Sequence, residues 1–229
     1  MIADAASAAP ARPFVTVVSG YPRSGTSLMM QMLEAGGLPV LKDESFRPTD
    51  ARNPRGYYEI EDALSLGAEG KTTDWVADAA GKGVKVIAYQ LQYLPSGFDY
   101  RVVFMRRRIA EVLASSGELQ MLRTDSPLSE PDKVMAYKTE YALYEAWLLR
   151  QTHMRAVFVS YNDLLEDAAG PVAEVCAFLD APPAGPLQPK RMIAAIDPAL
   201  YRNRRYGARA RSRAWRPCIA CAPASAQAD

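Results

Sequence analysis

The sequence is poor in the residues that bind metals and form disulfide frameworks. It has one histidine, His153, and three cysteines among 229 residues. Cys218 and Cys221 have the spacing of a CxxC, but a zinc site requires a second pair of ligands, which the sequence does not offer. Three cysteines do not make the paired framework of a small secreted domain. We therefore expect no metal, no disulfide framework and a cytoplasmic location.

Long hydrophobic runs are also missing. No segment approaches the ~18 consecutive apolar residues that a transmembrane helix needs. The N-terminal stretch MIADAASAAPARP has an early aspartate and no leucine-rich core, unlike a signal peptide. We therefore expect no membrane span. With 49% hydrophobic and 23% charged residues, the chain has the composition of a globular protein that buries a core.

A glycine-rich stretch, VSGYPRSGTSLMMQMLEAGG at 17–36, has most of a phosphate-binding loop. Four residues separate Gly20 from Gly25, and Ser27 supplies a hydroxyl, but Thr26 stands where a loop that binds ATP has lysine. That lysine contacts β- and γ-phosphates, and threonine brings no charge. Arg23 supplies positive charge closer to the first phosphate. The loop therefore predicts a nucleotide with a short 5′ chain.

The flanking residues favour this interpretation over a simple glycine-rich turn. FVTVVS at 14–19 is typical of a buried strand, and the apolar spacing from Ser27 to Ala35 predicts a helix that Gly36 and Gly37 end. Backbone N–H groups and the positive end of the helix then face an anion. The expected ligands come from Ser24, Gly25, Thr26 and Ser27.

The rest of the chain alternates expected strands and helices. Further strands are expected at 84–91, 100–105 and 155–161. Helices are expected after the arginines at 106–108, over about 132–152, and over PVAEVCAFLD. The alternation predicts an α/β fold of the P-loop type, with three α/β/α layers around a central parallel sheet. Ligands in such folds bind at the carboxyl ends of the strands.

We expect three segments along the chain. They are a disordered lead-in at 1–12, a single α/β domain at 13–206 and a disordered tail rich in Arg, Ala and Pro at 207–229. On the long helix, Tyr137, Tyr141 and Tyr144 share one face and are expected to pack in the core.

A second candidate site begins where the 100–105 strand ends, in RRIAEVLAS. Arg107 and Ser115 are eight residues apart with Glu111 midway, so all three would share one helix face. A guanidinium binds phosphate bidentately and serine adds a hydroxyl. Arginines before a helix are often only solvated. Together with the first loop, however, these predict a nucleotide that carries phosphate at two ends.

The segments YPRSGTS and RRIAEVLAS together resemble the two nucleotide-binding motifs of the sulfotransferases, which use 3′-phosphoadenosine 5′-phosphosulfate (PAPS). In that family the first loop binds the 5′-phosphosulfate, and the second, RxPxDxxxS, binds the 3′-phosphate through its arginine and serine. VSYNDLLEDAAGPVAEVCAFLD is similar to a later segment whose tyrosine, here Tyr161, lies near the adenine. The resemblance covers about residues 14–206 and implies PAPS as co-substrate, without a metal. A 5′-phosphosulfate has no γ-phosphate, so no loop lysine is needed.

The second motif and the first loop depart from the family at three positions. Ile109 and Glu111 replace the proline and the aspartate of RxPxDxxxS, and Leu28 stands where an aromatic residue often follows the loop. Many members use a histidine as general base, but His153 follows a long helix and is expected to be structural or exposed.

Other members of the family use a glutamate after the first helix as general base. The equivalent distance in this chain reaches Asp43 and Glu44. The resemblance makes Glu44 the first candidate, Glu59 the second and Asp43 the third, while the alternative is that they are ordinary exposed carboxylates.

The implied reaction is in-line sulfuryl transfer to a hydroxyl or amine. A carboxylate removes the acceptor proton, while Arg23, the loop N–H groups and Lys85 stabilise the developing charge. Lys85 lies in an expected strand, so an exposed solubilising lysine is the alternative. Arg204 and Arg205 loosely match a family segment that closes over the 3′-phosphate. We expect a small-molecule or glycan acceptor and no nucleic acid. The oligomeric state is left open.

Two other functions remain open. A P-loop kinase or nucleotidase would need a lysine at the loop, or a compensating one elsewhere, and an acidic strand end for Mg²⁺. The expected strands VIAYQL and VVFMRR do not end in aspartate. The third possibility is a relative that binds a nucleotide without catalysing a reaction.

Overall fold

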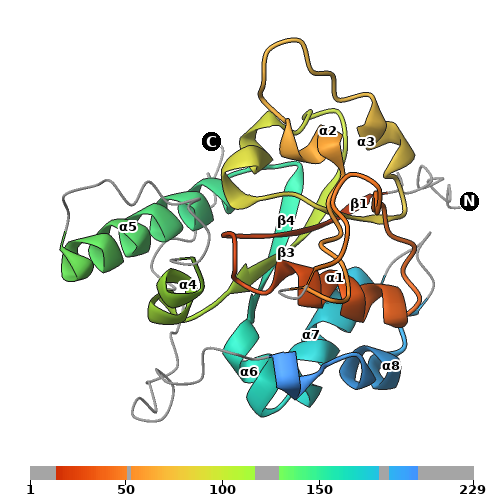
Figure 1. Cartoon of the computed structure of the whole chain (residues 1–229). Coiled ribbons are helices and arrows are strands. Elements are labelled where there is room, and N and C mark those ends of the chain that lie inside the picture. The colour runs from red at the N-terminus through yellow and green to blue at the C-terminus, as the bar shows by residue number, and fades with distance from the viewer. Residues whose placement is uncertain (1–13, 51–52, 117–128, 181–185, 201–229) are drawn as a thin grey trace, which may run out of the picture.

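The computed structural model describes residues 14–50, 53–116, 129–180 and 186–200, and a parallel β-sheet lies at its centre. Four strands lie in the order β2-β1-β3-β4 (Figure 1). They are β1 (Val15–Gly20), β2 (Gly83–Lys85), β3 (Tyr100–Arg106) and β4 (Met154–Ser160). All three pairings are parallel, so the carboxyl ends of the strands share one edge of the sheet.

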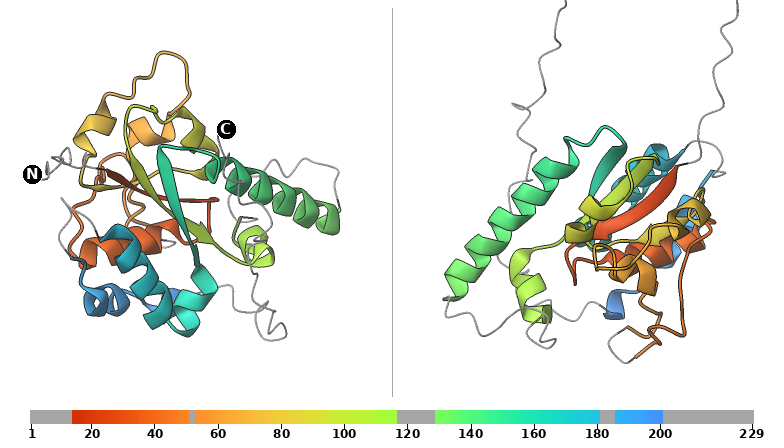
Figure 2. Two further views of the ribbon diagram at one scale, coloured as in Figure 1. Left: turned by 180° about the vertical axis from the view of Figure 1, so that it is seen from behind. Right: turned by 90° about the horizontal axis from the view of Figure 1, so that it is seen from above.

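Helices connect the strands and cover both faces of the sheet (Figures 1 and 2). The α-helices are α1 (Thr26–Ala35), α2 (Glu61–Leu64), α3 (Trp75–Asp78), α4 (Ile109–Ser116), α5 (Glu130–Leu148), α6 (Tyr161–Glu166), α7 (Ala169–Leu179) and α8 (Pro189–Ala194). Two 3₁₀ helices are η1 (Ala88–Tyr93) and η2 (Pro198–Leu200).

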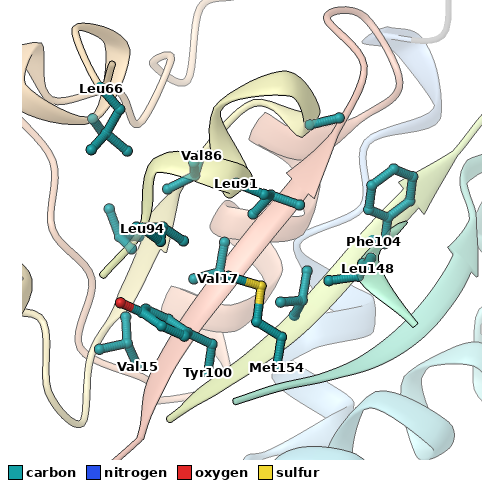
Figure 3. Close-up of a cluster of buried hydrophobic side chains, with 14 of the residues drawn as sticks. Val15, Val17, Leu66, Val86, Leu91, Leu94, Tyr100, Phe104, Leu148 and Met154 are labelled. Carbon is teal, nitrogen blue, oxygen red and sulfur yellow. The ribbon is translucent and has the colours of Figure 1, made fainter. Parts of the chain in front are cut away.

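Two hydrophobic cores, one on each face, follow from the alternation of side chains along the strands. Val17 of β1 packs in a core with Leu91 of η1 and Leu148 of α5, which Figure 3 shows. Its neighbour Val18 faces the opposite core, which contains Met29 of α1. The predicted three-layer α/β/α class is therefore confirmed.

The strand expected at 84–91 is wrong in length. β2 ends at Lys85, where its pairing with Val18 of β1 ends, and the chain continues into η1. β2 is an edge strand and β1 leaves the sheet at Gly20, so little remains to pair with. Leu91 is nevertheless buried, because η1 covers the sheet. The apolar residues at 84–91 therefore indicate that this segment is buried, but not that all of it forms a strand.

The long helix follows its sequence signals closely. Ser129 caps α5, accepting a hydrogen bond from the backbone N–H of Asp132, and Pro131 lies in the first turn. The three tyrosines that share a face of α5 surround Tyr21 of the glycine-rich loop, and Tyr141 stacks on it with ring centroids 4.2 Å apart. Their expected core packing is confirmed, and it fixes α5 beside the loop.

Several expectations concern parts of the chain outside the described residues. These are the lead-in at 1–12 and the tail at 207–229. Within the described ranges, no helix has both the length and the apolar character that crossing a membrane requires.

Candidate functional site

The loop between β1 and α1 depends on its two glycines. Gly20 has φ 142°, and a Cβ there would lie 2.6 Å from the carbonyl oxygen of Met105 on β3. Gly25 has φ 101°, and a Cβ there would overlap the ring of Tyr161. Both positions therefore combine left-handed backbone with close approach, which only glycine tolerates without strain. The spacing of these glycines reflects the geometry of this loop.

The N-terminus of α1 is the part of the loop whose backbone N–H groups could bind an anion. The first N–H groups of the helix, from Thr26 onward, have no acceptor inside the helix. Ser24 instead supports the loop itself, since its N–H donates to the carbonyl of Tyr21 at 3.1 Å. The Ser24 hydroxyl is buried, points at Gly20 and has no hydrogen-bond partner within the described ranges.

The two predicted motifs meet at the carboxyl edge of the sheet. Arg23 Nε of the loop donates to Ser115 Oγ of α4 at 2.8 Å, although the two residues are 92 positions apart. The Arg107 guanidinium donates from NH1 to the Arg23 carbonyl oxygen at 3.0 Å. Its carbon lies 4.5 Å from the centre of the Tyr161 ring. The structure therefore brings these four predicted site residues together.

A buried carboxylate orients Arg107. Glu111 is 0% exposed, and its Oε2 accepts from Arg107 Nε at 3.0 Å. Its Oε1 accepts from Asn162 Nδ2 at 3.0 Å, and Asn162 Oδ1 in turn accepts from the backbone N–H of Arg108. Sequence reasoning missed Asn162, although its position just beyond the end of β4 is the available signal.

Lys85 reaches the loop from the neighbouring strand. Its Nζ lies 3.2 Å from Ser27 Oγ, 2.9 Å from the Tyr57 carbonyl oxygen and 2.7 Å from Glu59 Oε1. The residue is only 7% exposed, so the alternative of a solubilising edge lysine is wrong. Burial lowers the pKa of Lys85, and the Glu59 charge opposes that shift. The ammonium group of Lys85 therefore lies beside the N-terminus of α1, although Thr26 replaces the lysine of an ATP-binding loop.

The three candidate carboxylates have different environments. Glu59 is 5% exposed and bound by cations, whereas the side chain of Glu44 is 81% exposed and pairs with Lys42 at 3.3 Å. Asp43 caps a turn, and its hydrogen bonds from the Ser45 side chain and neighbouring backbone hold the pKa of its carboxyl below the usual value. The carboxylate of Asp43 therefore stabilises its own turn.

A hollow of about 230 Å³ is lined by two of these carboxylates, Asp43 and Glu44. Two stretches of the chain line it, one within residues 42–49 and the other at residues 55–58. The lining residues are Lys42, Asp43, Glu44, Arg47, Pro48, Thr49, Arg55, Gly56, Tyr57 and Tyr58.

Arg47 was not identified from the sequence. It donates from NH1 to Glu59 Oε2, and its guanidinium carbon lies 3.8 Å from the centre of the Tyr57 ring. It belongs to a turn-rich charged segment without a strand end, so no motif pointed to it. Arg204 and Arg205 lie outside the described residues. Those residues contain no group of three or more His, Cys, Asp and Glu side chains that could hold a metal ion.

The chain matches no protein-family model and no curated protein sequence. Its fold is similar to that of retinol dehydratase, solved with androsterone and the inactive cofactor PAP, at a TM-score of 0.45 and 19% identity. That match covers 81% of this chain and 64% of the other, so this chain spans less than two thirds of that protein.

Two sulfotransferase domains are similar as well. The domain from the curacin biosynthetic pathway has a TM-score of 0.40 and 15% identity, over 82% of this chain and 76% of that one. The domain from the Synechococcus PCC 7002 olefin synthase has a TM-score of 0.41 and 17% identity, over 82% and 83%. These likenesses concern the fold alone.

Proposed function

We propose that this protein is a sulfotransferase that moves a sulfuryl group from PAPS to a hydroxyl or amine of a small-molecule or glycan acceptor. The observation that carries the proposal is the contact between the two motifs. The hydrogen bonds that join Arg23, Ser115 and Arg107 unite a loop for one phosphate with an arginine and a serine for another. A nucleotide with phosphate on both its 5′ and 3′ sides matches this pair. We propose a cytoplasmic location.

The proposed roles follow the positions of the side chains. The N–H groups at Gly25, Thr26 and Ser27 and the charge of Arg23 hold the 5′-phosphosulfate, with Ser24 shaping the loop. These N–H groups and Lys85 stabilise the charge on the leaving phosphate.

The other side of the nucleotide is assigned to the second motif. Arg107 and Ser115 bind the 3′-phosphate, and Tyr161 lies near the adenine. Arg204 and Arg205 are proposed to close over the 3′-phosphate. The transfer is in line, and it needs no metal.

The proton of the acceptor goes to a carboxylate. Glu44 is the first candidate because its carboxylate borders the hollow, where an acceptor has access. Glu59 is the second, but each of its two carboxylate oxygens already accepts a hydrogen bond from a cation, Oε1 from Lys85 and Oε2 from Arg47.

One observation favours a P-loop kinase or nucleotidase as a second candidate. The contact of Lys85 with Ser27 supplies the compensating lysine that such an enzyme would need. Against it, β3 ends at Arg106, which is paired with Glu145, and so offers a cation rather than a carboxylate for Mg²⁺. A non-catalytic nucleotide-binding relative is the third candidate, and it would bind PAPS without transferring the sulfuryl group.

Calorimetry with two ligands tests the proposal. We expect 3′-phosphoadenosine 5′-phosphate (PAP) to bind the full chain and ATP with Mg²⁺ to bind far more weakly. Tighter binding of ATP with Mg²⁺ would overturn the proposal in favour of the kinase. A positive result leads to incubation of the protein with ³⁵S-labelled PAPS and acceptor libraries, in which labelled product separates an enzyme from a non-catalytic relative.

A further inference from the structure

Arg47 lies between the hollow and the buried pair of Glu59 and Lys85. The guanidinium lines the hollow and lies over the ring of Tyr57. The side chain is 32% exposed, and NH1 is bound to Glu59. A guanidinium has five N–H donors, so Arg47 keeps donors for a further group on its open side.

Glu59 holds the two cations on its two oxygens. Oε1 accepts from Lys85 and Oε2 from Arg47, so neither cation competes with the other for the carboxylate. Lys85 continues to Ser27 in the first turn of α1. A chain of polar contacts therefore runs from the helix N-terminus through Lys85 and Glu59 to the hollow.

A strained residue fixes this arrangement. Tyr58 has φ 57°, which is uncommon for a residue with a side chain and typical of functional segments. Its hydroxyl donates to Glu34 of α1, which anchors the segment to the helix. The left-handed turn places the carbonyl of Tyr57 and the carboxylate of Glu59 on the same ammonium group of Lys85.

We propose that Arg47 is a further binding residue for the sulfuryl group of PAPS and that Glu59 is the positioning residue that holds Arg47 and Lys85 beside it. This inference rests on the proposed function. Arg47 approaches from the side of the hollow, and Lys85 approaches from the helix N-terminus. Glu59 then acts through these cations rather than as the base, which leaves Glu44 as the candidate for proton removal.

Two nucleotides that differ only in the sulfuryl group test the role of Arg47. Binding of PAPS and of PAP is measured by calorimetry, without acceptor, for wild type, Arg47→Ala and Arg55→Ala. Arg55 also lines the hollow but is fixed to Asp197 and to the carbonyl of Ala195, so it is the matched control. We expect Arg47→Ala to weaken PAPS binding roughly 10–100-fold, as for a lost charged hydrogen bond. PAP binding should stay within about twofold, by the same free-energy scale.

The outcomes of this experiment separate the two proposals. Equal losses for PAPS and PAP, or an equal effect of Arg55→Ala, would overturn the role of Arg47 and leave the nucleotide site standing. A wild-type protein that binds neither nucleotide would overturn both.

The pH dependence of binding tests Glu59 independently. Lys85 is surrounded by Glu59, by Arg47 of the turn-rich segment, by Arg23 of the loop and by Ser27 of α1. Glu59→Gln removes the one negative group among them, so the pKa of Lys85 should fall further. As the pH rises, Lys85 of the variant should then lose its charge earlier. PAPS binding should therefore weaken at a lower pH in the variant than in the wild type. Identical pH profiles would overturn the positioning role, and if the variant does not fold, the Arg47 comparison decides.

Discussion

Arg23 donates a hydrogen bond from Nε to the hydroxyl of Ser115, and this contact joins the glycine-rich loop to the helix that follows β3. β1 and β3 are adjacent and parallel, so the segments that leave their carboxyl ends are neighbours. The same edge receives Arg107, whose guanidinium reaches the backbone of the loop. The candidate nucleotide site therefore follows from the pairing of two strands.

Replacing Ser115 with alanine should weaken the binding of a 3′-phosphorylated nucleotide. The hydroxyl accepts from Arg23 and is proposed to donate to the charged 3′-phosphate, so its loss should cost roughly 1.5–3 kcal/mol of binding free energy. Calorimetry with PAP measures this. Adenosine 5′-phosphosulfate lacks the 3′-phosphate and is the control ligand. An equal loss for both ligands would show that Ser115 shapes the loop without contacting that phosphate.

Replacing Glu111 with glutamine should strongly destabilise the fold. Glu111 is 0% exposed and paired with Arg107, whose side chain is 8% exposed, so the variant removes a buried negative charge that lies against a buried guanidinium. Removing one partner of a buried pair costs about 3–5 kcal/mol. Glu166→Gln is the matched control, because the side chain of Glu166 is 70% exposed and pairs with Arg108. Its effect should stay below about 1 kcal/mol. Urea unfolding compares the two, and similar losses would refute the buried role.

Replacing Gly25 with alanine should cost more than the same change at Gly70. Both residues have positive φ, but a Cβ at Gly25 meets the Tyr161 ring and a Cβ at Gly70 meets nothing within 4 Å. Gly70→Ala therefore measures backbone strain alone, on the order of 1 kcal/mol. Gly25→Ala should add the cost of overpacking, roughly 1–3 kcal/mol. Thermal unfolding gives both values, and equal shifts would mean that the ring moves aside without cost.

Replacing Tyr141 with phenylalanine should preserve or raise stability. Its hydroxyl is buried and finds no hydrogen-bond partner within the described ranges. Such a group costs roughly 1–3 kcal/mol, and the phenylalanine ring keeps the stacking on Tyr21. Urea unfolding at pH 7 measures the change. A clear loss of stability would show that the hydroxyl has a partner.

The same variant has a defined pH dependence. Burial raises the pKa of Tyr141, so the folded state keeps the phenol neutral. In the wild type, this contribution is complete below about pH 10, the ordinary tyrosine value, and is lost as the pH rises through the folded-state pKa. Above about pH 10, Tyr141→Phe should therefore lose less stability with rising pH than the wild type does. Parallel curves would indicate that Tyr141 does not titrate on unfolding.

The loop was predictable because its chemistry is local. Gly20, Gly25 and the following helix are encoded within a few residues, and the strand-end rule added Arg107 and Tyr161. The end of β2 was not predictable, since Leu91 is buried in a 3₁₀ helix as it would be in a strand. Periodicity over a short apolar run does not separate these cases.

The partners of Lys85 were not predictable for a different reason. Lys85 contacts Glu59, and Arg47 contacts the same carboxylate. Both contacts depend on the path of residues 42–50 and 53–59, which lie far from Lys85 in the sequence. Tyr58 adopts a left-handed conformation on that path, and tyrosine gives no sequence signal for positive φ. The sequence shows that residue 85 is a lysine, but only the structure shows that its ammonium group faces the loop.

The most direct test of the two-phosphate site is a cycle of ligand and residue. The affinities of PAP and adenosine 5′-phosphate are measured for wild type, Arg107→Lys and Arg108→Ala, the last being the more exposed neighbour. Arg107→Lys keeps the charge and loses the bidentate geometry. We predict that the 3′-phosphate contributes roughly 1.5–3 kcal/mol less binding free energy in Arg107→Lys than in the wild type. In Arg108→Ala, its contribution should be unchanged. A 3′-phosphate contribution that is the same in all three proteins would contradict the account.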